Sequence, residues 1–147
     1  MQSAELLFGN PKKLWKRTAE GLETHVNRRM NVWGSGGAHS LYFRKIDEII
    51  THIFNQPLDE QPIGIADMGC GDGTLLKHLF EVVKNKTERG KNLDLYPLKI
   101  IGADFNKAAR LASTITLQEA KIDHSILNGD ISNPADYADN LKQKYLK

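Results

Sequence analysis

The stretch over residues 63–76 constrains the fold more than any other part of the chain. It opens with a short apolar run, residues 63–67, that ends in the carboxylate of Asp67, which is typical of a buried strand in a parallel sheet. Three glycines follow at alternate positions: Gly69, Gly71 and Gly73. Because glycine has no side chain, the backbone can turn sharply there and a ligand can approach it closely. A strand, a glycine turn and the start of a helix together predict a nucleotide-type site at the carboxyl end of the strand.

The spacing of the glycines separates this turn from the dinucleotide fingerprint. That fingerprint is Gly-x-Gly-x-x-Gly, whereas the third glycine here comes one residue early and Thr74 occupies the last position. The observed pattern, Asp-x-Gly-x-Gly-x-Gly, resembles the first motif of the Rossmann-like (class I) methyltransferases that use S-adenosylmethionine. The resemblance implies that Asp67 faces the positive charges of this cofactor and that the turn, Cys70 included, binds it. A glycine turn in another kind of α/β protein is the alternative.

The overall composition is that of an ordinary globular protein. The 147 residues suffice for one domain with a modest core, and a net charge of +2 gives no footprint for nucleic acid. No segment has the pattern of a signal peptide or a membrane span. The single cysteine excludes an internal disulfide, and no metal-ligand spacing is evident. We therefore expect a cytoplasmic protein with no nucleic-acid, membrane or metal partner.

The part of the chain before the first strand is predicted to be helical. Residues 1–11 are expected to form a tether and residues 12–56 a pair of amphipathic helices, since apolar residues recur there every three or four positions. The glycine-rich segment 33–39 separates the two helices. It is either a linker or a loop that closes over a cofactor or substrate, in which case His39 could act as a base.

The second candidate site element follows the second predicted strand, residues 98–103, and consists of Asp104, Phe105 and Asn106. An acid at this strand end can accept hydrogen bonds from both ribose hydroxyls, and Phe105 could lie against the adenine ring. Such an acid normally follows the glycine turn by about 20 residues, and we attribute the longer spacing here to a polar surface insertion over residues 85–96. The alternative, a helix-capping role for Asp104, is weakened because Asn106 can cap the next helix.

That next helix is predicted over residues 106–120. Its apolar positions are expected to face the core: Ala108, Leu111, Ala112, Ile115 and Leu117.

A third candidate element follows the third predicted strand, residues 125–127. In the resembled family, an acid after this strand accepts a hydrogen bond from the adenine amino group, and the next apolar residue lies against the ring. Asp130 and Ile131 occupy these positions. An ordinary Asn-Gly-Asp turn is the alternative. A further helix is expected from Pro134 onward.

The resemblance implies a Rossmann-like methyltransferase fold, a three-layer sandwich around a parallel sheet preceded by two helices. Residues 62–147 would form only its S-adenosylmethionine-binding half, truncated after the third strand and helix. We expect the remainder of the methyltransferase domain to be a partner that covers the first strand, because an uncovered apolar edge is prone to aggregate. The catalytic residues stay unknown, since those that contact the methyl acceptor usually follow the fourth strand.

The chain is similar to methyltransferase domains of bacterial polyketide synthases in three features: the N-terminal helices, the 33–39 loop and the amino-acid sequence of residues 101–109. This similarity implies an acyl or polyketide intermediate bound to an acyl carrier protein as the substrate. Two other functions remain open. One is an NAD(P)-dependent oxidoreductase, against which Thr74 counts, and the other is a cofactor-binding domain without turnover.

Overall fold

The computed structural model describes residues 8–10, 16, 18–19 and 43–145. The chain divides into two compact units, residues 1–40 and 41–147. The sheet and every helix named below belong to the second unit. Most of the first predicted helix and the whole 33–39 loop with His39 lie outside the described residues, whereas the second predicted helix is found over residues 43–53.

Within the described residues, the sheet consists of three parallel strands in the order β1-β2-β3. Their bounds are Gly64–Met68 for β1, Lys99–Asp104 for β2 and His124–Asn128 for β3. Met68 lies opposite Ala103 in the first pair of strands. Asp104 lies opposite Asn128 in the second pair, so all three carboxyl ends meet at one edge. The predicted parallel sheet is confirmed, with each strand within one residue of its expected bounds.

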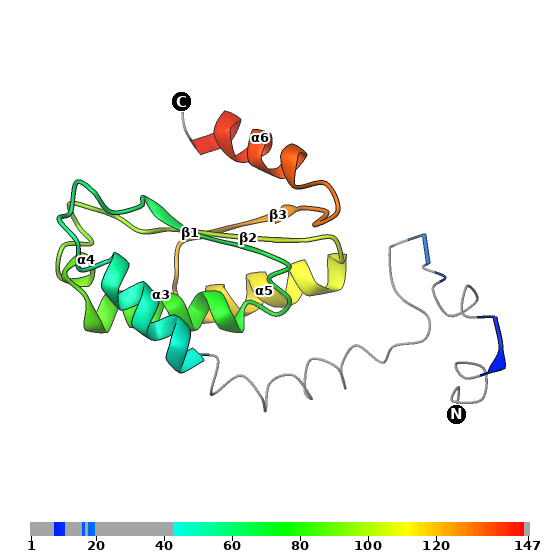
Figure 1. The fold of residues 1–147 in the computed structure, drawn as a ribbon, viewed down its shortest axis with the longest axis horizontal. Coiled ribbons are helices and arrows are strands. Elements are labelled where there is room, and N and C mark those ends of the chain that lie inside the picture. Colours follow the sequence, from blue (N-terminus) through cyan, green and yellow to red (C-terminus); the bar gives the residue numbers. More distant parts are fainter. Residues whose placement is uncertain (1–7, 11–15, 17, 20–42, 146–147) are drawn as a thin grey trace. The chain divides into compact units, whose positions relative to one another are not determined.

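Helices cover both faces of this sheet (Figure 1). One face carries the helix over residues 43–53, α3 (Thr74–Lys86) and α5 (Lys107–Glu119), and the other carries α6 (Pro134–Tyr145). The core lies between the sheet and the first group of helices. It is built from apolar side chains of the strands, the helices and the loops between them: Phe54, Ile65, Leu76, Leu79, Val83, Leu98, Ile100, Leu117 and Ile122. The predicted three-layer Rossmann-like arrangement is therefore observed.

The helix over residues 43–53 is joined to α3 by a polar contact as well as by packing. His78 Nε2 lies 2.5 Å from Asp47 Oδ1, and Lys86 Nζ lies 3.5 Å from the other oxygen of the same carboxylate. Phe43 stacks on the His78 ring with the two ring centroids 4.6 Å apart. These contacts hold the helix on the same side of the sheet as α3, away from α6.

The buried face of α5 differs from the predicted one. Leu111 and Ile115 are 56% and 54% exposed, whereas Ser113 and Leu117 are fully buried. The expectation was therefore wrong for Ala108, Leu111 and Ile115, which are exposed, and is confirmed for Leu117. The physical reason is the close approach of α5 to the glycine turn, where a Cβ atom on Gly73 would lie 3.0 Å from Ser113 Cα. Only a small side chain fits at that contact.

Residues 85–96 are not the wholly polar surface insertion that the sequence suggested. They contain the short helix α4 (Glu88–Lys91) and two buried polar side chains, Thr87 and Arg89. The guanidinium of Arg89 donates hydrogen bonds to Gln61 Oε1 and to the carbonyl of Pro97, both at 3.3 Å. Burial lowers the pKa of this guanidinium. The insertion is thus anchored to the segment that precedes β1.

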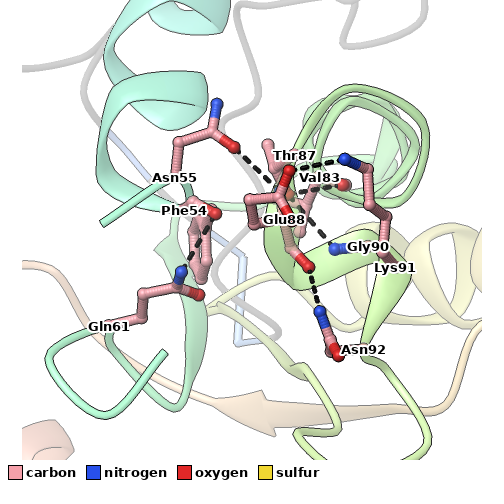
Figure 2. A network of polar contacts seen from close by, with 9 residues as sticks. All are labelled: Phe54, Asn55, Gln61, Val83, Thr87, Glu88, Gly90, Lys91 and Asn92. Atoms are coloured by element: carbon pink, nitrogen blue, oxygen red, sulfur yellow. Dashed lines mark hydrogen bonds and ion pairs between the residues drawn. The ribbon is translucent and has the colours of Figure 1, made fainter. Parts of the chain in front are cut away.

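Thr87 belongs to a neighbouring network of polar contacts at the junction of α3 and α4 (Figure 2). Its hydroxyl donates to the carbonyl of Val83 at 2.7 Å and accepts from the amide of Gly90 at 3.2 Å, so it joins α3 to α4. Next to it, the amide of Glu88 donates to Asn55 Oδ1 at 2.8 Å, and Gln61 Nε2 donates to the carbonyl of Phe54 at 3.1 Å. The end of the 43–53 helix is thereby fixed to the junction of α3 and α4.

We expect Thr87→Ala to lower the free energy of unfolding by about 1–2 kcal/mol, because it removes the side-chain cap of α4 and leaves the partly buried amide of Gly90 without its hydroxyl acceptor. Thr87→Ser keeps the hydroxyl and is the matched control, with a loss below about 1 kcal/mol. Urea unfolding followed by circular dichroism measures both. Equal losses for the two variants would show that the methyl group, not the hydroxyl, stabilises this junction.

Candidate functional site

The glycine turn between β1 and α3 has the backbone conformation that requires glycine. The φ angles of Gly69, Gly71 and Gly73 are 96°, 56° and 80°, a region that other residues rarely adopt. A Cβ atom built on Gly69 or Gly71 would have nothing within 4 Å, whereas one on Gly73 would meet the backbone of Ser113. The first two glycines therefore border open space at the carboxyl edge of the sheet, and the third allows α5 to pack closely.

The turn is held to the neighbouring strand by its own backbone. The amides of Gly69 and Cys70 both donate to the carbonyl of Ala103, at 2.7 and 3.0 Å. The hydroxyl of Ser113 donates to the carbonyl of Gly71 at 2.9 Å. With β2 on one side and α5 on the other, the turn is fixed before any ligand binds.

Cys70 was predicted to contact the cofactor, and the structure places its side chain in the core. Its Sγ atom lies 3.3 Å from Ser113 Oγ, and burial raises the pKa of the thiol. The amide of Cys70 is occupied by Ala103. The buried thiol is therefore turned away from the open space beside Gly69 and Gly71.

Asp104, at the end of β2, places its carboxylate beside the turn. One oxygen accepts from the amide of Gly71 at 3.2 Å, and the other accepts from the amide of Asn106 at 2.8 Å. The side chain is held in one orientation by these bonds, and the residue is 9% exposed. Each carboxylate oxygen has a second lone pair, so Asp104 can still accept hydrogen bonds from a pair of hydroxyls.

The two residues after Asp104 have different roles. Asn106 caps α5, since its side-chain oxygen accepts from the amide of Ala108 at 2.8 Å, as the sequence suggested. Asn106 is buried, whereas Phe105 is 43% exposed. The exposed aromatic ring of this residue, which directly follows Asp104 in the chain, offers an apolar surface on which a flat ring can stack.

Asp67, at the end of β1, is the second carboxylate of the site. Burial raises the pKa of this carboxyl group, and the negative charge of Asp104 raises it further. Two carboxylates that repel each other in a partly buried site favour a ligand with positive charge, because such a ligand lowers the cost of keeping both ionised.

This raised pKa predicts a pH-dependent stability. The folded protein holds the proton of Asp67 to higher pH than the unfolded chain, whose value is 3.8, so the free energy of unfolding falls as the pH rises from 3.8 through the raised pKa. We expect Asp67→Asn to be more stable than the wild type at pH 7 and to lose this advantage below pH 3.8. Urea titrations across this range measure it, with Asp59→Asn as the control for loss of an exposed acid. An advantage that does not change with pH would contradict the electrostatic explanation.

The third predicted element lies beside the second. The amide of Gly129 donates to the carbonyl of Asp104 at 3.4 Å, which brings the segment after β3 to the end of β2. Ile131 is 70% exposed, and one oxygen of Asp130 accepts from the amide and the hydroxyl of Ser132, at 2.9 and 2.7 Å. Asp130 thus shapes its own turn, as the alternative interpretation proposed, and its contact with adenine stays a prediction.

Two residues of α5 that contact this site were missed from the sequence. Ser113 bonds to the glycine turn, and Arg110 bonds to the ends of β2 and β3. The sequence signal that could have found them is their spacing along α5, since both lie on the same face of the helix as the buried Leu117. A serine and an arginine in that stripe are polar residues where the helix meets the rest of the domain.

Two negative findings concern the described part of the chain. Its helices are each too short or too polar to cross a membrane. Within the same residues, His, Cys, Asp and Glu side chains do not gather in a group of three or more that could hold a metal ion.

The geometry agrees with the comparisons with known proteins. Residues 23–147 match the sequence model of the Methyltransf_36 family, described as the AprA MT2-like domain. Among curated proteins, none gives a significant match to the sequence. The family match includes β1, the glycine turn, β2, β3 and all the candidate site residues. The chain therefore belongs to the AprA MT2-like family of methyltransferase domains.

Proposed function

We propose that this domain binds S-adenosylmethionine at the carboxyl edge of its sheet and serves a methyl-transfer reaction. The observation that carries the proposal is the open space beside Gly69 and Gly71, next to the Asp104 carboxylate. A side chain at either glycine would enter this space. The free approach to the backbone therefore suits a ligand that lies along the turn.

The residues present fit this cofactor group by group. Asp104 would accept hydrogen bonds from the ribose hydroxyls, and the exposed Phe105 and Ile131 would lie against the adenine ring. Asp67 would face the ammonium and sulfonium charges of the methionine part. When bound, S-adenosylmethionine supplies a methyl group attached to a sulfonium sulfur. This sulfur is a good leaving group when the methyl group is transferred. The contribution of these residues is then to orient the donor and to exclude water from it.

The same features disfavour a nicotinamide dinucleotide. Its pyrophosphate is negatively charged and would lie at the glycine turn, where Asp67 and Asp104 already repel each other. A cationic ligand lowers that repulsion and an anionic one increases it. The pair of acids thus supports S-adenosylmethionine over NAD(P).

For the methyl acceptor, we propose an acyl or polyketide intermediate bound to an acyl carrier protein, in the cytoplasm. The support is the similarity of the 33–39 loop and residues 101–109 to methyltransferase domains of polyketide synthases. The residues that would choose and activate the acceptor are not assigned among the described side chains.

We also propose that a further strand of the methyltransferase domain pairs with β1. Among the described residues, β1 pairs with β2 alone, and Ile63 beside it is half exposed. An apolar cavity of about 240 Å³ lies along this edge, lined by residues of β1 and β2 and by Leu141 of α6. A strand at this edge would satisfy the open backbone groups of β1 and cover the apolar surface.

Calorimetric titration of S-adenosylhomocysteine and, separately, of NADH into the protein tests the cofactor proposal. We expect saturable binding of S-adenosylhomocysteine and none of NADH. Binding of NADH alone would refute the proposal in favour of an oxidoreductase, and binding of neither would favour a domain without cofactor. Addition of excess S-adenosylmethionine before the titration should abolish the S-adenosylhomocysteine signal, which tests that both share one site.

A further inference from the structure

Helix α5 carries two polar side chains, Arg110 and Ser113, that lie one turn apart and face the candidate site. Between them they contact the glycine turn, the end of β2 and the end of β3. These are the three segments that hold the proposed cofactor-binding residues. The segments come from distant parts of the sequence, so the distances between them in the fold depend on the side chains that connect them.

Arg110 joins the second and third segments through a single nitrogen. Its Nη1 atom lies 2.8 Å from the carbonyl oxygen of Asp104, 2.7 Å from that of Phe105 and 2.8 Å from Oδ1 of Asn128. Asp104 and Asn128 are the last residues of β2 and β3 and lie opposite each other. The guanidinium therefore bonds both strands at the point where their regular pairing ends.

The acceptors of Arg110 indicate what the side chain does. None of the three is a carboxylate, so its charge is directed at backbone and amide oxygens of the site. Hydrogen bonds from a charged donor to such oxygens are stronger than neutral ones. They fix the two peptide groups on either side of the Phe105 Cα atom, the first of which belongs to Asp104.

Ser113 joins the first segment to the same helix. Its hydroxyl donates to the carbonyl of Gly71 at 2.9 Å, and the residue is fully buried against the turn. Gly71 in turn donates its amide to Asp104. The glycine turn is thus attached both to α5 and to the carboxylate proposed to bind the ribose.

We propose that Arg110 and Ser113 are positioning residues that set the spacing of the ribose-binding and adenine-binding segments before the cofactor arrives. The inference rests on the proposed function and adds to it two residues that contact no ligand. Segments already fixed in the bound arrangement lose less conformational freedom on binding, which raises affinity. Arg110 acts on the adenosine part of the ligand, because it holds the backbone of Asp104 and Phe105.

Calorimetric titration of S-adenosylhomocysteine into Arg110→Ala tests the inference. We expect binding about tenfold weaker than in the wild type, from the loss of hydrogen bonds made by a charged donor. Lys107→Ala is the matched control, since it removes one positive charge from an exposed position at the start of the same helix and should leave the affinity unchanged. Arg110→Lys should fall in between, because its ammonium keeps the charge and reaches fewer of the three oxygens.

Chemical rescue separates positioning from a general loss of structure. Guanidinium chloride at about 20 mM, far below the molar concentrations that unfold proteins, should recover part of the affinity of Arg110→Ala, and sodium chloride at the same concentration should not. The same additions should leave the wild type and Lys107→Ala unaffected. Ser113→Ala should also weaken binding, by about threefold, from the loss of one neutral hydrogen bond.

Each outcome decides a different point. If the wild type binds no S-adenosylhomocysteine, the proposed function fails. If the wild type binds and Arg110→Ala binds equally well, the positioning role is overturned while the proposed function stands. A loss in Arg110→Ala that guanidinium does not recover, with a matching fall in the unfolding midpoint, would likewise overturn it. Arg110→Lys, if Arg110→Ala fails to fold, gives the same decision through its intermediate affinity.

Discussion

We expect Gly71→Ala to abolish measurable binding of S-adenosylhomocysteine while the protein stays folded. A methyl group at this position would project into the open space beside the Asp104 carboxylate and not into protein, since nothing lies within 4 Å of it. The positive φ of 56° adds strain of about 1–2 kcal/mol to the folded state, a modest share of the stability of a small domain. The loss of affinity should be about 100-fold or more, equivalent to about 2.7 kcal/mol.

The same substitution two residues later gives the control. In Gly73→Ala the new methyl group would meet Ser113 Cα at 3.0 Å, so the protein must shift α5 in addition to bearing the strain of a positive φ. Its main effect should be a lower free energy of unfolding, measured by urea denaturation. If Gly71→Ala binds S-adenosylhomocysteine as the wild type does, the open space beside the turn is not the cofactor site.

Asp104→Asn should weaken S-adenosylhomocysteine binding by about 30-fold, because a charged acceptor for two hydroxyls is replaced by a neutral one. The amide group would also face either Gly71 or Asn106, each of which donates a hydrogen to this side chain in the wild type. Calorimetry measures the affinity, and thermal unfolding shows how much of the loss reflects the fold. Asp72→Asn is the matched control, an acid of the same turn whose carboxylate accepts from Thr74.

Asp104→Asn has a second readout in the apo protein. Since the charge of Asp104 contributes to the raised pKa of Asp67, its removal should lower that pKa. Carboxyl-carbon NMR titration of Asp67 in the two proteins measures the change. An unchanged Asp67 pKa together with full affinity would show that the two acids do not share a site.

The parts of the site that could be predicted from sequence are those fixed by backbone chemistry. The end of each buried strand could be read from the end of its apolar run. In a parallel sheet the residues at these ends lie at one edge. Asp67, Asp104 and the segment after β3 could therefore be assigned to the same edge. The glycine turn could be predicted because positive φ angles select glycine strongly, and all three glycines have them.

The parts that could not be predicted depend on how distant segments pack. The buried face of α5 is decided by its contact with the glycine turn, and that contact requires the small Ser113. The apolar pattern had instead favoured Leu111 and Ile115 for the buried face, and both are exposed. In the same way, Arg89 is buried by the segment before β1, although its neighbours in sequence are polar. Periodicity along one helix does not show which neighbour the helix will meet.

A crystal structure of the protein with S-adenosylhomocysteine tests the central claim most directly. The account predicts the ligand along the glycine turn, with its ribose hydroxyls within hydrogen-bond distance of Asp104 and its adenine beside Phe105. A ligand bound elsewhere, or bound at this edge with its ribose away from Asp104, would contradict the site proposed for this methyltransferase domain.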